Sequence, residues 1–437
     1  MSSNQQLAEG FRETEIGQLP DEWPVVTIGD LFDIQQGKAL SHKNKTEGSK
    51  KPFLRTANVF WGYLDLTDLD QMFFTEDEAK RLHLQNGDLL ICEGGDIGRT
   101  AMWRGEVSDC LHQNHVHRVR SKNPNVVPEF YMYWMQAAML MFNLYSGEGN
   151  KTTIPNLSKS RLSSFSVPLP PKIDQQCITY TLNTVQSARE QTDAVIAATR
   201  ELKKSLMKHL FTYGPTPPNQ RDKIKLKTTD IGEMPEEWEI KSIGDIAHIN
   251  KESRNPERIP ADSFAYLDIA GVEGETGRII DVKKILGKNA PSRARRVIHT
   301  NDVVLSTVRP YLKAFTLIPP ELDNQICSTG YAVLTSKDII TPQYLLYLAY
   351  TDSVGSQFKQ HMRGANYPAI NPGHISSTKI PLPPISVQER IAATLSSVDK
   401  KTAVELNKKK ALDDLFNTLL HDLMTAKLRV NHLEVPT

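Results

Sequence analysis

The sequence predicts an α+β protein in which one mixed α/β domain occurs twice and two long helices separate the copies. A proline run reading (V/I)-P-L-P-P occupies Val167–Pro171 and returns 213 positions later at Ile380–Pro384. A long helical pattern follows each run and ends near Phe211 in the first copy and Met424 in the second. A repeat this long exceeds the roughly 20–50 residues of a solenoid unit. We therefore expect a duplicated domain with one long helix after each copy.

Each copy opens with the same short pattern, (E/D)-I-G-x-(L/M)-P-x-E-W, followed by I-G-D. The first copy carries it at Glu15–Trp23 and Thr27–Leu31, and the second at Asp230–Trp238 and Ser242–Ile246. The tryptophans that close the first segment are 215 positions apart, so the beginning and the end of the repeat agree within two residues. This shared order of segments indicates that the two copies have one fold.

Inside each copy, short apolar runs bounded by polar turns predict β-strands. These runs are Pro52–Val59 and Gly87–Ile91 in the first copy, and Phe264–Ala270 and Asn301–Leu305 in the second. Loops interrupt them at 94–99 and 307–311, and helices with proline in the first turn are expected from Pro128 and Pro342. Strands and helices do not alternate regularly, so each copy is expected to be a mixed α/β domain.

Apolar residues recur at spacings of three and four along both helical patterns, on an otherwise charged background. This narrow stripe is typical of a coiled-coil seam. Thr192 and Thr402 weaken the middle of the seams. Neither helix can bury its stripe alone, so we expect the two helices to pair with each other. The seam residues are Ile178, Leu182, Val185, Ile196, Leu206 and Leu210 in the first helix, and Ile391, Leu395, Val398, Leu412, Leu415, Leu419 and Leu423 in the second.

The repeats and their punctuation divide the chain into segments. Gly214 and the prolines after it end the first helix and begin a linker. The expected segments are an N-terminal arm (1–14), a first domain (15–170), a first spacer helix (171–213), a linker (214–229), a second domain (230–383), a second spacer helix (384–427) and a tail (428–437).

Composition and cysteine usage indicate an ordinary intracellular protein. The 437 residues carry a formal net charge of +1, which favours neither nucleic acid nor another class of partner. The four cysteines are scattered and form no C-x-x-C pair, so neither a metal knuckle nor a disulfide framework is expected. No apolar run approaches the roughly 18 residues of a membrane span. We expect a soluble, cytoplasmic protein that does not enter a membrane.

The sequence shows no catalytic motif of an amino-methyltransferase or of an ATP-driven motor. It contains no N-P-P-Y or D-P-P-Y stretch and no G-x-x-x-x-G-K-(S/T) loop. The stretch Gly94–Gly98 is better explained as a turn than as a phosphate loop, because the second copy has Thr307–Pro310 there. Glu236, Glu239 and Lys241 faintly suggest a nuclease set, but the first copy lacks them, so chance explains them better. We expect no catalytic residue and no cofactor.

Three histidines, His112, His115 and His117, crowd one expected strand and suggest a metal site. No carboxylate or thiol partner is evident beside them, and the second copy offers Asn324–Cys327 in the corresponding region. We therefore expect surface or DNA-facing histidines rather than metal ligands, and no metal site.

The two copies of G-x-(L/M)-P-x-x-W and I-G-D, each closing with P-L-P-P, glutamine and a long helix, resemble the specificity subunit of type I restriction–modification systems. The end of the first helix, Leu202–Gly214, is similar to the helix end of that family, and the resemblance covers the chain from about Glu15 to Met424. It implies two target recognition domains, each reading one half of a split DNA sequence. It also implies that the helices pack as an antiparallel coiled coil, which serves as spacer and docks two adenine methyltransferase subunits. The chain itself would carry no catalysis, and restriction would need further motor-nuclease subunits.

The length of the helices supports a spacer role. A helix over the 37 residues from Gln175 to Phe211 spans about 55 Å at 1.5 Å per residue, whereas one turn of B-DNA spans about 34 Å. Domains held at opposite ends of such a rod would contact half-sites about one turn or more apart. Because the copies differ between their shared segments, the two half-sequences are expected to differ.

The candidate DNA contacts are basic and amide side chains in or beside the expected loops. Arginine, lysine, asparagine and glutamine read base edges, and lysine and arginine anchor phosphates. In the first copy the candidates are Lys38, Lys43, Lys45, Arg55, Arg99, Gln113, Asn114 and Lys151. In the second copy they are Arg254, Arg293, Arg295, Arg296, Arg309, Lys313, Arg363 and Asn366.

Two other function classes fit the same residues. The first is a non-DNA adaptor in which two globular domains bind proteins and the coiled coil joins them, and the near-neutral charge leaves room for it. DNA binding that weakens steeply with salt would separate the two interpretations, since phosphate contacts release counterions. The second is a self-contained enzyme with an unrecognised active site, which methyl transfer by the isolated chain would support.

Overall fold

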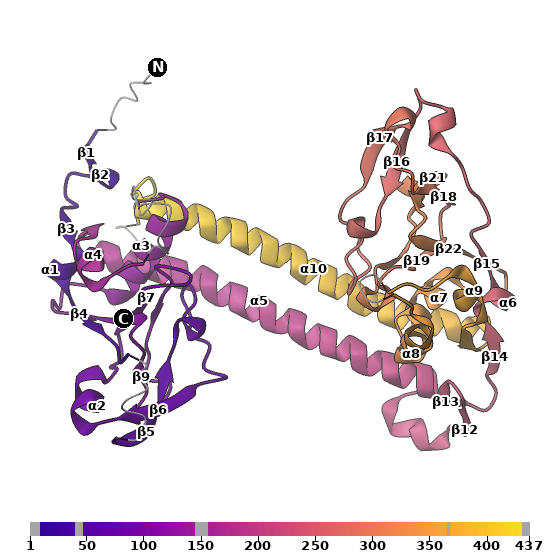
Figure 1. Ribbon diagram of the computed structural model, residues 1–437, viewed down its shortest axis with the longest axis horizontal. Coiled ribbons are helices and arrows are strands. Elements are labelled where there is room, and N and C mark those ends of the chain that lie inside the picture. Colours follow the sequence, from indigo (N-terminus) through magenta and orange to yellow (C-terminus); the bar gives the residue numbers. More distant parts are fainter. Residues whose placement is uncertain (1–8, 40–46, 145–155, 365–367, 431–437) are drawn as a thin grey trace. The chain divides into compact units, whose positions relative to one another are not determined.

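The computed structural model describes residues 9–39, 47–144, 156–364 and 368–430. It contains two compact units: unit 1 comprises residues 1–192 and 408–437, and unit 2 comprises residues 193–407. Figure 1 labels the elements of both units. Each of the two long helices contributes one part to unit 1 and the other part to unit 2.

Unit 1 is built on a four-stranded antiparallel sheet in the order β4-β10-β7-β8. A second sheet, β6-β5-β9, pairs β5 antiparallel with β6 and parallel with β9, and two strand pairs, β1-β2 and β11-β3, complete the unit. The strands are β1 (Phe11–Thr14), β2 (Gly17–Pro20), β3 (Val25–Thr27), β4 (Phe32–Gln36), β5 (Ser49–Leu54), β6 (Asp70–Phe74), β7 (Leu89–Cys92), β8 (Thr100–Met102), β9 (Leu111–His112), β10 (Val116–Ser121) and β11 (Ser166–Pro168). The helices are α1 (Ile28–Leu31), η1 (Thr56–Asn58), α2 (Glu76–Leu82), α3 (Pro128–Leu140) and α4 (Lys159–Ser163).

Unit 2 has a four-stranded antiparallel sheet in the order β15-β22-β19-β20, a second sheet in the order β17-β16-β21-β18, and the strand pairs β12-β13 and β14-β23. The strands are β12 (Leu226–Thr229), β13 (Gly232–Pro235), β14 (Glu239–Ser242), β15 (Ala247–Ile249), β16 (Ser263–Leu267), β17 (Lys283–Leu286), β18 (Ala294–Ile298), β19 (Val303–Ser306), β20 (Phe315–Leu317), β21 (Gln325–Ser328), β22 (Tyr331–Ser336) and β23 (Lys379–Leu382). The α-helices are α6 (Ile243–Ile246), α7 (Pro342–Ala349), α8 (Asp352–His361) and α9 (Pro372–Ser377). The 3₁₀ turns are η2 (Pro218–Lys223), η3 (Pro256–Arg258), η4 (Ile269–Gly271), η5 (Gly287–Asn289), η6 (Pro310–Leu312) and η7 (Pro320–Leu322).

The two units share one plan, which confirms the expected duplication, and they differ in the second sheet. Unit 1 has the helix α2 between β6 and β7, whereas unit 2 has the strand β18 between β17 and β19. Because β18 pairs with β21, the second sheet of unit 2 has one strand more. The strand β12 lies inside the expected linker and forms a hairpin with β13, just as β1 does with β2.

The repeated I-G-D pattern forms a helix cap in both units. The Thr27 hydroxyl accepts from the Asp30 backbone N–H at 3.2 Å, and the Asp30 carboxylate accepts from the Thr27 N–H at 2.9 Å. Ser242 and Asp245 make the same pair of bonds at 3.3 and 2.9 Å. This reciprocal capping box satisfies backbone donors that a helix start would otherwise leave unpaired.

The glycine of the same pattern is required by close packing. A Cβ atom on Gly29 would lie 2.1 Å from the Ser163 hydroxyl oxygen, and one on Gly244 would lie 2.3 Å from that of Ser376. Real contacts are never this short, so α1 and α6 approach the helices α4 and α9 only because these positions have no side chain.

A buried glutamine explains why the proline run and the helix after it recur together. The Gln175 side-chain amide donates to the Pro170 carbonyl at 2.8 Å, and that of Gln388 donates to the Pro383 carbonyl at 2.9 Å. The amide oxygen of each glutamine accepts from the N-cap backbone N–H of α3 or α7, at 2.8 and 2.9 Å. Each glutamine therefore ties the end of a domain to the start of its long helix.

The long helices are α5 (Lys172–Tyr213) and α10 (Ile385–Met424), and they pack together within each unit. In unit 1 the Arg189 Nε donates to Asp413 at 2.7 Å, and its guanidinium lies 4.6 Å from the Phe416 ring centre. In unit 2 the Lys203 ammonium lies 2.6 Å from Asp399. Since the residues that follow the end of α5 contact Arg390, near the start of α10, the helices run antiparallel in unit 2. The expected pairing is confirmed.

One seam assignment is wrong. Leu415 was expected in the seam, but its side chain is 45% exposed, and the neighbouring Phe416 is buried instead. The two threonines in the middle of the seam are buried, and each donates its hydroxyl to a carbonyl one turn back in its own helix, Thr192 at 2.7 Å and Thr402 at 3.0 Å. The seam therefore tolerates them because their polar groups are satisfied.

Each unit has its own principal core. In unit 1, side chains of α3 and α5 pack with residues from the end of α10, among them Leu420 and Leu423. In unit 2, side chains of α7 pack with Leu210 of α5 and with Ile391 and Leu395 of α10. Among the described residues, no helix is long and apolar enough to cross a membrane.

Candidate nucleic-acid interface

Each unit has two loops that pack against each other beside its four-stranded sheet, and we call them the tip of that unit. The tip of unit 1 comprises residues 60–63 and 93–99, and the tip of unit 2 comprises residues 273–278 and 307–314. In unit 1 the Gly62 N–H donates to the Thr100 carbonyl at 2.9 Å. In unit 2 a Cβ atom on Gly274 would lie 1.8 Å from the Leu312 carbonyl oxygen, so the loops touch through bare backbone.

The tip of unit 1 presents an aromatic and cationic stack. The rings of Phe60 and Tyr63 lie parallel with their centres 4.9 Å apart, and Tyr63 is 50% exposed. The Arg99 guanidinium lies 5.0 Å from the centre of the Phe60 ring and 2.5 Å from the Asp96 carboxylate. Aromatic rings and guanidinium groups of this kind are what proteins stack on nucleic-acid bases.

The tip of unit 2 holds two cationic residues in left-handed backbone. Arg309 has φ 47° and Lys313 has φ 53°, on either side of the short turn η6. Counted from the flanking strands, these positions correspond to Gly95 (φ 74°) and Gly98 (φ 80°) in unit 1. Left-handed backbone costs a residue with a side chain roughly 1–2 kcal/mol, and such strain concentrates at functional sites.

The base of this second tip is firmly held. The Lys313 ammonium donates to the Tyr350 carbonyl at 3.0 Å, and the Tyr350 hydroxyl donates to the Phe315 carbonyl at 2.7 Å. Burial raises the pKa of Tyr350, so its phenol stays a donor. Above this base, Tyr311 and Leu312 are each 55% exposed. The tip is therefore a rigid loop with an apolar end.

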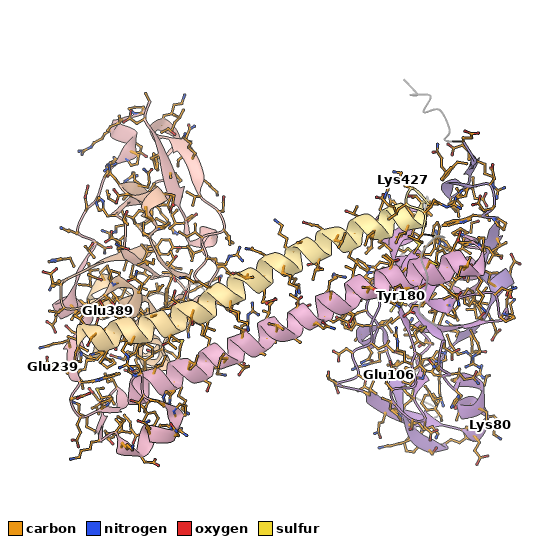
Figure 2. The ribbon with its side chains drawn as sticks, turned by 180° about the vertical axis from the view of Figure 1, so that it is seen from behind. Lys80, Glu106, Tyr180, Glu239, Glu389 and Lys427 are labelled. Atoms are coloured by element: carbon orange, nitrogen blue, oxygen red, sulfur yellow. The ribbon has the colours of Figure 1, made fainter. Side chains whose placement is uncertain are left out.

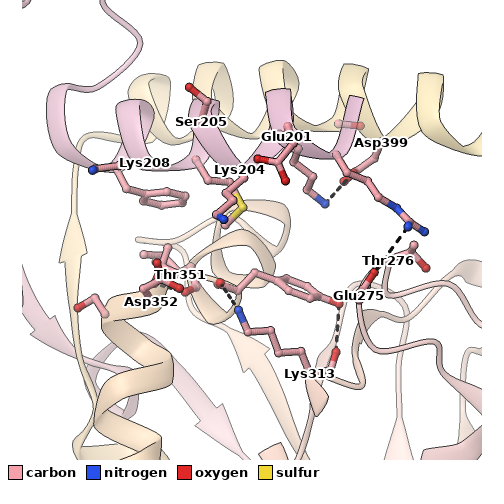
Figure 3. A pocket seen from close by; sticks show the side chains of 18 of the residues that line it. Glu201, Lys204, Ser205, Lys208, Glu275, Thr276, Lys313, Thr351, Asp352 and Asp399 are labelled. Atoms are coloured by element: carbon pink, nitrogen blue, oxygen red, sulfur yellow. Dashed lines mark hydrogen bonds and ion pairs between the residues drawn. The ribbon is translucent and has the colours of Figure 1, made fainter. Parts of the chain in front are cut away.

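A groove of about 1450 Å³ lies beside the tip of unit 2 (Figure 3). Its walls are the second half of α5, the first half of α10 and both loops of the tip. Lys203 lines it in an ion pair with Asp399. Lys204 and Lys208 line it from α5, are exposed, and form no ion pair within the part of the chain that the structure describes. Cationic side chains outnumber carboxylates in the lining, which favours an anionic ligand.

Several candidates of the first copy are engaged inside unit 1. Lys38 is 11% exposed and lies 2.5 Å from the Glu78 carboxylate, and Arg55 lies 2.9 Å from Asp70. Gln113 is half-buried in the turn between β9 and β10. Asn114 lies beside Gln113 in that turn, and Arg99 belongs to the tip. Lys43, Lys45 and Lys151 lie outside the described residues.

The candidates of the second copy fall into two places. Arg254, Arg293, Arg295 and Arg296 gather at β18, where the Arg254 N–H donates to the Arg295 carbonyl at 2.9 Å. Arg295 also lies 3.4 Å from the Glu257 carboxylate.

Arg309 and Lys313 form part of the tip, away from the β18 group in the sequence. Arg363 is exposed, and its backbone N–H donates to the Ala369 carbonyl at 3.1 Å, on the segment that also accepts the Arg309 N–H. Asn366 lies outside the described residues.

The expectation of surface or DNA-facing histidines is wrong for two of the three. His112 and His117 are fully buried on β9 and β10, and only His115, in the turn between these strands, is exposed. The His112 ring contacts the Gln35 carbonyl at 3.3 Å, and burial lowers the pKa of His112 to about 4. Burial also lowers the pKa of His117. Within the described residues, no group of histidine, cysteine, aspartate and glutamate side chains is arranged to hold a metal ion.

Sequence reasoning missed the apolar members of both tips and the lysines of the groove. Tyr63, Tyr311 and Leu312 are neither basic nor amide residues, so the residue types that predict DNA contacts do not include them. Lys204 and Lys208 are basic, but they lie on a helix and not in a predicted loop. A usable signal was present for Tyr311, because an aromatic residue in a loop between two buried strands has no place in the core that those strands form.

Comparison with known proteins decides the family. The domain described as "Type I restriction modification DNA specificity domain" matches residues 20–197 and again 235–414. The chain belongs to this family. The expected resemblance and the expected duplicated fold are thereby confirmed. Members of the family are DNA-binding specificity subunits that work with methyltransferase and restriction subunits, and those other subunits carry the catalysis.

Relatives of this specificity subunit match over nearly its whole length. It is 23% identical over 435 residues to the putative type I restriction enzyme MjaX specificity subunit of Methanocaldococcus jannaschii, covering 97% of both chains. It is 21% identical over 392 residues to the EcoDI specificity subunit of Escherichia coli, covering 86% of this chain and 81% of that one. The S subunit of a type I system from M. genitalium has the same fold, with a TM-score of 0.57 and 16% identity over 97% of this chain and 98% of that one.

Proposed function

We propose that unit 1 and unit 2 each read one half of a split DNA sequence, and that the long helices act as the spacer and dock two adenine methyltransferase subunits. In this proposal residues 15–170 and 230–383 are the target recognition domains, and 171–213 and 384–427 are the spacer helices, with 214–229 as the linker. Restriction motor-nuclease subunits join the complex for cleavage, which takes place in the cytoplasm.

The observation that carries the proposal is a matched framework with unmatched tips. Both units use the same capping box, the same bare glycine and the same buried glutamine. The tips share a position but not a chemistry, since one presents Phe60, Tyr63 and Arg99 and the other presents Tyr311 and Leu312 between Arg309 and Lys313. Two scaffolds of one fold that carry different contact groups suit two different half-sequences.

The helices support the docking part of the proposal. Large apolar side chains remain exposed on them: Leu202 and Val404 in unit 2, and Tyr180, labelled in Figure 2, and Leu415 in unit 1. Exposed apolar residues on a helix surface are the usual anchors of a protein partner.

The proposal is tested by co-expression with the cognate methyltransferase, followed by mapping of methylated adenines. The expected result is a bipartite motif with two unlike halves. A continuous motif, or the absence of a complex, would count against the proposal. DNA affinity of the complex should fall steeply with salt, because phosphate contacts release counterions. An adaptor that binds only proteins would show no such dependence.

The spacer role has a test of its own. Removing one heptad from both α5 and α10 shortens each helix by about 10 Å, and the number of base pairs between the mapped half-sequences should change. The control removes seven residues from the polar segment before β12, which should leave the spacing unchanged. An unchanged spacing in the shortened protein would rule out the ruler.

A further inference from the structure

The groove of unit 2 depends on a run of cations that has no counterpart in unit 1. Arg200, Lys203, Lys204 and Lys208 of α5 line it. The residues 213 positions later, which occupy the same places at the end of α10, are Asp413, Phe416, Asn417 and His421. The same helical face is therefore basic in one unit and mostly neutral in the other.

In unit 2 some of these cations form ion pairs within the unit, and the others are available to bind an anion. Lys203 pairs with Asp399 at 2.6 Å, and Arg200 lies 4.0 Å from Glu275 of the tip. Lys204 and Lys208 are exposed on the groove wall, and no described residue forms an ion pair with either. Arg278, on the tip loop that faces them, is likewise exposed and outside any ion pair with the described residues.

In unit 1 the corresponding helical face is closed by packing. The Asp413 carboxylate accepts from Arg189, and Phe416 is buried beneath the Arg189 guanidinium and the Tyr133 ring. His421 is held at 2.8 Å by the neighbouring Asp422. These four positions of unit 1 therefore offer no lysine or arginine side chain to an anion.

The other wall of the groove carries the strained tip. Tyr311 and Leu312 are held out by the left-handed residues on either side of them, and the Lys313 bond to the Tyr350 carbonyl fixes the loop beneath. The α5 wall carries four cations against one carboxylate, Glu201, and the facing wall carries a rigid apolar end. These two walls match the two parts of nucleic acid. Phosphates take lysine and arginine, and an apolar wedge enters the minor groove between base steps.

We propose that the phosphate backbone of the second half-site lies in this groove, with Lys204, Lys208 and Arg278 on phosphates and with Tyr311 and Leu312 against the bases. This proposal rests on the proposed function, because it assigns one half-site to unit 2. It adds that the two units hold DNA differently. In unit 2, cationic side chains of a helix bind phosphates. Unit 1 contacts DNA through the Phe60 and Tyr63 stack and has no such cations on the corresponding helical face.

The test uses the full-length protein in complex with its methyltransferase and a duplex that carries the mapped bipartite motif. Binding is measured by fluorescence anisotropy over a range of salt concentrations, together with assembly of the protein complex without DNA. The groove variant is Lys204→Gln/Lys208→Gln, and its matched control is Lys401→Gln/Lys408→Gln, two exposed lysines that do not line the groove. The tip variant is Tyr311→Ala/Leu312→Ala, and its control is Ile339→Ala, an exposed apolar residue of unit 2 that lies outside the groove and the long helices.

The groove variant should reduce the slope of log affinity against log salt by about 2, since each phosphate contact contributes about 0.9. It should weaken binding equally for all base sequences. The tip variant should keep the slope but lose about 10-fold in discrimination against single-base changes in the second half-sequence, because one base pair commonly contributes 1–3 kcal/mol. Discrimination in the first half-sequence and both control variants should stay unchanged.

Three results would overturn the inference and leave the proposed function standing. These are an unchanged salt slope in the groove variant, unchanged discrimination in the tip variant, and loss of complex assembly in either, which would make the groove a protein-docking surface. If the wild-type complex itself shows no preference for the mapped duplex, the proposed function fails, and the inference fails with it.

Discussion

Unit 1 and unit 2 share the same hydrogen bonds in their framework, and they differ in the loops of their tips. Thr27 and Asp30 in one unit, and Ser242 and Asp245 in the other, form the same cap with distances that agree within 0.1 Å. At the tips, glycines in unit 1 take the left-handed conformations that Arg309 and Lys313 take in unit 2. This fold therefore fixes the joints between each domain and its long helix, whereas the chemistry of its loops is free to vary.

The largest expected effect tests whether the two joints are equivalent. Gln175→Ala and Gln388→Ala each leave one part-buried N–H and one buried carbonyl without this partner, at about 1–3 kcal/mol per group. We expect each to reduce the free energy of unfolding of its unit by about 2–4 kcal/mol, measured by hydrogen exchange in α3 and α7. The exposed neighbours Gln176→Ala and Glu389→Ala should change it by less than about 0.5 kcal/mol. A large loss of unfolding free energy in only one of the two units would show that the two joints are not equivalent.

A smaller effect distinguishes the units by pH. His112 has an ordinary pKa of 6.5 when unfolded and a pKa of about 4 in the buried strand, so only the unfolded chain gains this proton between those values. Its stabilising contribution is complete above pH 6.5 and is lost as pH falls toward 4, about 2 kcal/mol of it by pH 5. His117 acts in the same direction. In unit 2 the matching strand position holds Cys327, whose pKa burial raises.

This difference is measured as hydrogen-exchange protection of β9 and β10 against that of β21 and β22 at pH 7 and pH 5. The variant His112→Gln should flatten the pH dependence in unit 1, and the exposed His115→Gln should leave it as it is. If both units of the wild-type protein lost the same amount of protection between pH 7 and pH 5, the pH dependence could not be assigned to His112.

The smallest effect concerns the backbone of the tips. Gly95→Ala places a side chain at φ 74° with nothing within 4 Å, so only backbone strain opposes it, at about 1 kcal/mol. Its neighbour Gly94 also has open space but no positive φ, and Gly94→Ala should be neutral or slightly stabilising. Unfolding midpoints of the two variants give the difference directly. If they unfold alike, the left-handed turns at Arg309 and Lys313 carry no strain.

The framework could be predicted from the sequence because each of its bonds leaves a residue-type requirement behind. A capping box needs Thr or Ser three residues before Asp, and a backbone contact as close as that at Gly29 needs glycine. When such requirements recur 213–215 positions apart, the duplication is readable without a structure.

The tips and the second sheet could not be predicted in this way, because their features depend on contacts far apart in the sequence. Lys38 looks like any loop lysine until the chain brings Glu78 to it. His112 looks exposed until folding brings its ring, now fully buried, to the Gln35 carbonyl far away in the sequence. The residues around Arg309 do not predict its left-handed backbone, because arginine seldom adopts that conformation.

The order in which the ribosome delivers the chain gives the shared core of unit 1 a further meaning. Unit 2 is a continuous stretch, residues 193–407, whereas the core of unit 1 includes Phe416, Leu420 and Leu423. At about 5–20 residues per second, the first domain to be made waits at least ten seconds for these side chains. During that time its apolar surface is open to chaperones and proteases. The domain that begins folding first is therefore the last to be finished.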